Sequence, residues 1–127
     1  MSRKILIADD NKLLLAMSRE ALEQAGFEVT TVDTSIQVYK TVLEEKPDIV
    51  LLDIMMPGID GIEICRNLKK SPVTQNTVII IHSGKTDMAL MDLCFEVGAE
   101  AFIIKGDDIE AMVNKVREIA GEKLGSS

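Results

Sequence analysis

The segment DIVLLDIMMPGIDG, residues 48–61, decides the fold of this chain. It contains a short, continuous apolar run, residues 49–52, which ends at Asp53. Such a run is typical of a strand buried on both faces, and strands of that kind occur in parallel sheets that helices cover on both sides. The segment therefore predicts an α/β domain.

Four further short apolar runs predict strands at residues 4–8, 28–32, 78–81 and 101–104. The segments between the runs have helical spacing and predict helices at approximately 12–25, 36–45, 60–69 and 87–97. A last helix is predicted by the apolar face of Ile109, Met112, Val113, Val116 and Ala120. Strand–helix units joined by right-handed crossovers give a single doubly wound (βα)5 domain, with helices on both faces of a five-stranded parallel sheet.

Composition limits the number of domains and the class of partner. The chain has 127 residues, enough for one domain with its own core, and we expect that domain to span residues 1–122, with a flexible tail at 123–127. The net charge is -7, and the sequence has no cluster of Lys or Arg. Because nucleic-acid backbones require a basic surface, we expect no direct binding to nucleic acid.

The N-terminal apolar run and the cysteines bear on the compartment. Residues 5–8 are too few for a signal-peptide core or a membrane span, so we expect a cytoplasmic protein without membrane insertion. Cys65 and Cys94 lack the spacing of a metal-binding pair. We predict that both are free thiols in a reducing compartment.

Polar residues stand where the predicted strands end. Asp9 and Asp10 follow the first strand, Asp53 ends the third, Ser83 follows the fourth and Lys105 ends the fifth. Ligands bind at the carboxyl edge of an open parallel sheet, where the strand order reverses. If the first and third strands are neighbours, three carboxylates share one pocket there.

Each of these residues also has an ordinary interpretation. Asp10 or Asn11 could cap the first helix, and Ser83 could cap the fourth. Asp53 could be a polar strand end, and Lys105 could be a solvated cation. The combination indicates more, because two carboxylates about 4 Å apart repel each other by roughly 4 kcal/mol at an effective dielectric constant of about 20. A divalent cation relieves that repulsion.

Oxygen ligands without His or Cys favour a hard cation such as Mg²⁺. In a phosphoryl-transfer site of this kind, Asp53 would be the nucleophile that forms an acyl phosphate. The Lys105 ammonium would neutralise charge on the transferring oxygens, and the Ser83 hydroxyl would donate a hydrogen bond to one of them.

Four motifs carry a family resemblance: ILIADDN at 5–11, DIVLLDIMMPGIDG at 48–61, IIIHSG at 79–84 and GAEAFIIK at 98–105. With them the chain resembles the receiver domain of bacterial two-component response regulators and is similar to the stand-alone chemotaxis regulator. The resemblance covers residues 3–122. It implies a flavodoxin-like sheet with strand order 2-1-3-4-5.

The resemblance implies roles around a bound metal. Asp53 is then the phosphorylation site, and Asp10, Asp53 and the backbone carbonyl of Met55 ligate Mg²⁺. Asp9 acts mainly through a metal-bound water. The side chains of Met55 and Lys85 occupy positions that tune the access of hydrolytic water.

The resemblance also implies how the phosphoryl group is sensed. Ser83 and Lys105 contact it, and Phe102 occupies the aromatic switch position. The alternative is that Phe102 is an ordinary apolar residue of the last strand. The chain departs from the family at Gly106, where a proline usually follows the lysine. We expect the loop that aims Lys105 to be looser or differently bent, because glycine is the most permissive residue.

Two features near this constellation have competing interpretations. His82 precedes Ser83 and could be a metal ligand or a phosphoryl carrier, but strand alternation predicts that it points away from the side of Ser83, as a structural or exposed histidine. The helix at 87–97 has more apolar positions than one buried stripe requires, so some of them are expected at the surface, unless the helix is simply packed more deeply.

These observations predict a signalling switch, not an enzyme, that assists its own phosphorylation and autodephosphorylation. A sensor histidine kinase or phosphotransfer protein would supply the phosphoryl group. The face formed by helix 87–97, strand 101–104 and the last helix would bind a downstream protein or a second copy of the chain. Two other classes stay open: an interaction module that is never phosphorylated, and a hydrolytic enzyme with Asp53 as nucleophile.

Overall fold

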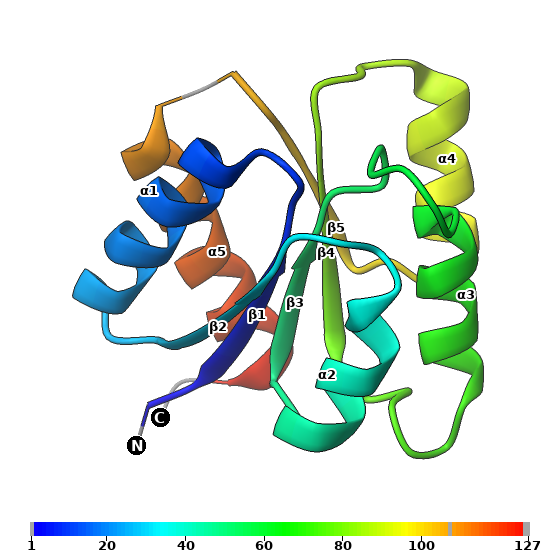
Figure 1. The fold of residues 1–127 in the computed structure, drawn as a ribbon, viewed down its shortest axis with the longest axis horizontal. Coiled ribbons are helices and arrows are strands. Elements are labelled where there is room, and N and C mark those ends of the chain that lie inside the picture. The colour runs from blue at the N-terminus through cyan, green and yellow to red at the C-terminus, as the bar shows by residue number, and fades with distance from the viewer. Residues whose placement is uncertain (1, 107, 126–127) are drawn as a thin grey trace.

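The computed structural model describes residues 2–106 and 108–125, in which strands and helices alternate (Figure 1). The strands are β1 Lys4–Ala8, β2 Glu28–Val32, β3 Ile49–Leu52, β4 Val78–Ser83 and β5 Ala101–Ile104. The helices are α1 Lys12–Gln24, α2 Gln37–Glu45, α3 Gly61–Lys70, α4 Met88–Glu96 and α5 Ile109–Leu124.

The five strands form one parallel sheet in the order β2-β1-β3-β4-β5, which confirms the predicted fold. In the register of the sheet, Leu52 of β3 lies between Ala8 of β1 and Ile81 of β4. The residues that follow Ala8 and Leu52 therefore leave the sheet side by side at the same edge.

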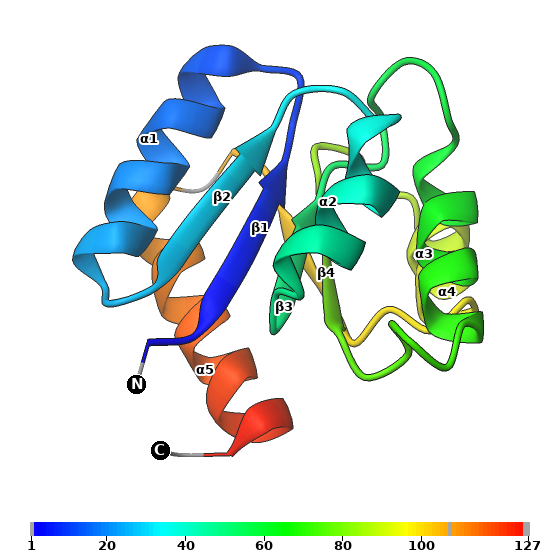
Figure 2. The ribbon, with the colours of Figure 1, turned by 60° about the horizontal axis from the view of Figure 1, so that its bottom comes forward.

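Alternation along the strands builds two cores, one on each face of the sheet. Leu6, Val50 and Ile79 belong to the core beneath α2, α3 and α4. Their neighbours, including Ile7 and Leu51, belong to the core beneath α1 and α5. The two helical layers are visible on either side of the sheet in Figure 2.

Short polar side chains cap the starts of α1, α3, α4 and α5. Asn11 caps α1 by accepting a hydrogen bond from the Leu14 amide at 3.1 Å, and Asp60 caps α3. Asp87 caps α4, so the interpretation of Ser83 as the cap of that helix is wrong. Ser83 is instead the last residue of β4, which is longer than the run of apolar residues predicted.

The C-terminal helix also runs further than expected. α5 continues to Leu124, so Lys123 and Leu124, which the sequence predicts to belong to the tail, are helical. Arg3 donates a hydrogen bond to the carbonyl of Gly125 and holds this end against the start of β1. The rest of the expected tail, 126–127, lies outside the described residues. Across the described part of the chain, none of the helices combines the length and the apolar character that crossing a membrane requires.

Candidate functional site

Two buried carboxylates and one exposed carboxylate meet at the carboxyl edge of the sheet. Asp9 follows β1 and Asp53 follows β3, and both are nearly inaccessible to solvent, whereas Asp10 is exposed. One carboxylate oxygen from each of Asp9, Asp10 and Asp53 lies within 4.8 Å of the others. The predicted cluster of three carboxylates is therefore present, because the register places β1 beside β3.

Backbone amides fix the two buried carboxylates. The Asn11 amide donates to Oδ1 of Asp9 at 2.9 Å, and the Met55 amide donates to Oδ1 of Asp53, also at 2.9 Å. Each bond spans two residues, so the chain turns sharply around its own carboxylate just after the strand. The Oδ2 atoms of both side chains remain for other partners.

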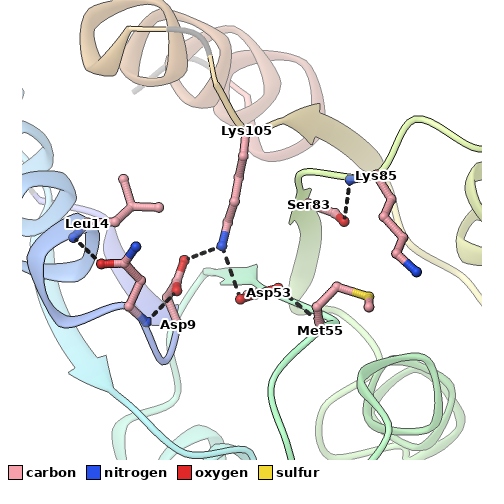
Figure 3. A network of polar contacts seen from close by, with 8 residues as sticks. Asp9, Leu14, Asp53, Met55, Ser83, Lys85 and Lys105 are labelled. Carbon is pink, nitrogen blue, oxygen red and sulfur yellow. Dashed lines mark hydrogen bonds and ion pairs between the residues drawn. The ribbon is translucent and has the colours of Figure 1, made fainter.

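Lys105 supplies the partner of both Oδ2 atoms (Figure 3). Its ammonium lies 2.8 Å from Oδ2 of Asp9 and 3.0 Å from Oδ2 of Asp53. Burial alone would lower the pKa of Lys105, but the hydrogen bonds and charges of Asp9 and Asp53 outweigh burial and raise that pKa. Lys105 is therefore a stable cation in this pocket.

Ser83 is fully buried on the opposite side of Asp53 from Asp9 (Figure 3). Its Oγ accepts a hydrogen bond from the Lys85 amide at 3.2 Å. Within residues 2–106 and 108–125, the Ser83 hydroxyl donates to no protein acceptor. A buried hydroxyl with an unused proton is suited to an acceptor oxygen on a ligand.

The donor set fits a hard divalent cation. Asp9, Asp10 and Asp53 carry more negative charge than the single ammonium of Lys105 neutralises. All of the ligand atoms are oxygens, which Mg²⁺ prefers over nitrogen and sulfur donors. These three carboxylates could hold Mg²⁺, with their exposed member, Asp10, at the solvent side.

The loop after Asp53 is shaped by a glycine at a point of close contact. A Cβ atom at Gly61, the first residue of α3, would lie 2.4 Å from Cα of Ile54. Only glycine lets the start of α3 pack against the residue that follows Asp53. This contact is the physical reason for the spacing between the aspartate and the glycine in the motif at 48–61.

His82 is buried beside this site, so the alternative that it is exposed is wrong and the structural interpretation holds. Burial, and then the positive charge of Lys105, lower the pKa of His82 to about 4, although Asp9 opposes that effect. The imidazole is therefore neutral near pH 7.

Phe102 of β5 is partly buried against the core beneath α2, α3 and α4. Its role as a switch stays a prediction.

The apolar residues of α4 and the two cysteines lie as the sequence predicts. Met88 and Phe95 of α4 are exposed, which confirms that some apolar residues of that helix reach the surface. Cys65 and Cys94 are free and buried, and burial raises the pKa of the Cys65 thiol to about 12. Gly106 has φ 108°, a left-handed conformation that proline cannot adopt.

One residue of the site's surroundings was missed at the level of sequence. Ser35, in the β2–α2 connection, donates to the carbonyl of Pro57 at 3.0 Å and accepts from the amide of Ile59 at 2.9 Å. A single serine in a connection has no periodicity and no motif that would identify such contacts. They depend on two loops meeting at the edge of the sheet.

Residues 5–117 match the response regulator receiver domain family. The chain is 33% identical to the phosphate regulon transcriptional regulatory protein PhoB of Pseudomonas aeruginosa, over 94% of this chain and 52% of that protein. It is 34% identical to the DNA-binding response regulator MtrA of Mycobacterium tuberculosis, over 92% of this chain and 50% of that protein.

One solved structure is similar to this chain in both fold and sequence. The BeF3-activated receiver domain of DrrB, a Thermotoga maritima OmpR/PhoB homolog, is 31% identical and superposes with a TM-score of 0.83, over 94% of this chain and 97% of that chain. The present chain spans about half the length of the curated relatives that it matches. By sequence and fold, it belongs to the response regulator receiver domain family.

Proposed function

We propose that this chain is a phosphorelay switch that accepts a phosphoryl group on Asp53 from the phosphohistidine of a sensor histidine kinase or a phosphotransfer protein. The observation that carries the proposal is the arrangement of Asp53 itself. It is a buried carboxylate at the carboxyl edge of the sheet, with a second carboxylate and the Lys105 ammonium within reach. Membership of the receiver domain family supports the same reaction.

In the proposed reaction, a carboxylate oxygen of Asp53 forms a bond to phosphorus as the phosphorus–nitrogen bond of phosphohistidine breaks. The electron pair of that bond returns to the imidazole nitrogen of the donor. Lys105 then faces phosphoryl oxygens as well as carboxylate oxygens, and its ammonium offsets the added charge. The unused proton of the Ser83 hydroxyl gives a second contact to a phosphoryl oxygen.

Mg²⁺ would be held by Asp9, Asp10, Asp53 and the backbone carbonyl of Met55, with Asp9 acting mainly through water. When bound, the ion offsets negative charge on the carboxylates and on the oxygens of the transferring group. The excess of carboxylate charge over the Lys105 ammonium is the feature of this chain that supports its binding.

The signal would end when water hydrolyses the acyl phosphate. The chain would assist the phosphorylation and dephosphorylation of its own Asp53 only. We therefore classify it as a switch and not as an enzyme. Met55 is half exposed beside Asp53, and the Lys85 amide contacts Ser83. These positions support the proposal that both side chains tune the access of water.

For output, we propose that the surface formed by α4, β5 and α5 contacts a downstream protein or a second copy of the chain. Met88, Phe95 and Ile104 supply exposed apolar area there. Phe102, on the same strand as Ile104, would couple this surface to Ser83. MtrA is described as DNA-binding, but we propose that this segment itself makes no contact with DNA, because its net charge is -7.

The direct test is intact mass after incubation with acetyl phosphate or phosphoramidate, with and without Mg²⁺. Wild type should gain one phosphoryl group only when Mg²⁺ is present, and Asp53→Asn should gain none. Asp92→Asn, which changes an exposed aspartate of α4, is the matched control and should behave as wild type. Failure of wild type to gain mass from either donor would overturn the proposal and favour an unphosphorylated interaction module.

A further inference from the structure

We propose that Ser35 is a positioning residue for the metal site, because its hydroxyl clamps the β3–α3 connection that carries Met55. This inference rests on the proposed function, since it concerns the binding of Mg²⁺ by the same carboxylates. Nothing in the reaction itself requires a residue from the β2–α2 connection, so the clamp is a separate property of this chain.

The clamp is a single buried hydroxyl that bonds two backbone groups. Ser35 is only 2% exposed, and its Oγ donates to the Pro57 carbonyl at 3.0 Å and accepts from the Ile59 amide at 2.9 Å. These two groups flank Gly58, so the hydroxyl closes a small loop around that glycine. One buried side chain therefore satisfies both the Pro57 carbonyl and the Ile59 amide.

The absence of a side chain at Gly58 leaves room for the Ser35 hydroxyl. Its φ is +102°, which favours glycine, and a Cβ atom there would lie 2.7 Å from Oγ of Ser35. The serine and the glycine thus depend on each other. A side chain at 58 would displace the hydroxyl, and loss of the hydroxyl would leave the left-handed turn without its support.

The clamp is connected to Met55 by only one intervening residue, Met56, because Ser35 bonds the carbonyl of Pro57. On one side, the Met55 amide donates to Oδ1 of Asp53. On the other side, Met56 is buried and precedes a proline, which restricts its backbone to extended conformations. The Met55 side chain is half exposed and provides little anchorage of its own. The orientation of the Met55 peptide is therefore set between Asp53 and the bonds to Ser35.

Loss of the Ser35 hydroxyl should make the β3–α3 connection more mobile without removing any of the proposed Mg²⁺ ligands. In Ser35→Ala, the Pro57 carbonyl and the Ile59 amide lose their partner, and the connection gains freedom that Mg²⁺ binding would have to restrict. Partners that orient ligands typically contribute about 10-fold or more to metal affinity. We expect the dissociation constant of Mg²⁺ to rise by about 10-fold in this variant.

Thr74→Val is the matched control, because it also removes a buried hydroxyl bond. The Thr74 hydroxyl donates to the Leu68 carbonyl at 2.6 Å in the α3–β4 connection, at the opposite edge of the sheet. Mg²⁺ would be titrated without phosphodonor by calorimetry and by amide NMR shifts, and unfolding would be followed in the same samples. Both variants should lose stability, but only Ser35→Ala should bind Mg²⁺ more weakly.

Two further readouts keep the test decisive. Hydrogen exchange of the Ile59 amide in Mg²⁺-free protein should accelerate in Ser35→Ala and stay slow in Ser35→Thr, which retains a hydroxyl. Gly58→Ala should weaken Mg²⁺ binding in the same direction even if Ser35→Ala fails to fold. The proposal is wrong if Gly58→Ala or a folded Ser35→Ala binds Mg²⁺ as tightly as wild type. It is also wrong if Thr74→Val loses as much Mg²⁺ affinity as Ser35→Ala. If wild type itself binds no Mg²⁺, the proposed function fails and not the clamp alone.

Discussion

The ammonium of Lys105 lies 3.0 Å from Oδ2 of Asp53, although the two residues are 52 positions apart in the chain. The same ammonium bonds Asp9, so the cation that follows β5 holds together the two carboxylates that follow β1 and β3. Both carboxylates are buried, and a buried charge without a partner is costly. This relationship links the stability of the fold to the site.

Lys105→Gln should lower the free energy of unfolding at pH 7 by about 1–3 kcal/mol in the absence of divalent cations, because two buried carboxylates lose a charged donor. The pKa of Lys105 is raised above its ordinary value of 10.5, so its contribution is complete below that pH and is lost as the pH rises through the folded-state pKa. Urea unfolding from pH 7 to pH 11 measures the difference. Exposed Lys85→Gln is the control, and an equal effect of both variants would contradict the assignment.

His82 should make the fold sensitive to mild acid. Its pKa falls from 6.5 to about 4 in the folded chain, so the folded state resists a proton that the unfolded state accepts. Stability from this residue is therefore present above pH 6.5 and is lost as the pH falls towards 4, by up to about 3 kcal/mol. His82→Phe should lack this part of the slope between pH 7.5 and pH 4.5 in urea unfolding. Since carboxylates titrate in both proteins, parallel curves would contradict the prediction.

Substitution of two glycines by alanine should change the stability in opposite directions. Gly61→Ala places a methyl group 2.4 Å from Cα of Ile54, so the backbone must shift, and we expect a loss of about 2 kcal/mol or more. Gly121 lies inside α5 with nothing within 4 Å of a Cβ atom. Gly121→Ala should therefore raise stability by about 0.5–1 kcal/mol. Thermal and urea unfolding check both signs, and a neutral Gly61→Ala would show that the contact can relax.

Gly106 should reject the proline that is usual in this family. Its φ of 108° is unsuited to any side chain, and the proline ring requires φ near about −65°. We expect Gly106→Ala to lower stability by about 1 kcal/mol and Gly106→Pro to lower it further. Urea unfolding ranks the two variants. A proline variant as stable as wild type would mean that this turn has a second accessible conformation.

Most of the architecture was predictable from local patterns. The strand positions followed from continuous apolar runs, and the exposed apolar residues of α4 followed from an excess over one buried stripe. The strand order was implied only by resemblance to a family. The errors fell at the ends of elements: Ser83 belongs to β4, and α5 continues to Leu124. Polar residues at such ends carry no hydrophobic signal, so periodicity does not locate them.

The sequence by itself determined which residues could reach the edge of the sheet, because a residue that follows an apolar run must emerge at the carboxyl end of a strand. Asp9, Asp53 and Lys105 were identifiable on that basis. Only the tertiary structure decided that Lys105 bonds both carboxylates, that His82 is buried, and that Ser35 clamps the loop after Met55. The physical reason is that hydrogen bonds and desolvation depend on distances between segments remote in sequence, and the packing of the whole sheet sets those distances.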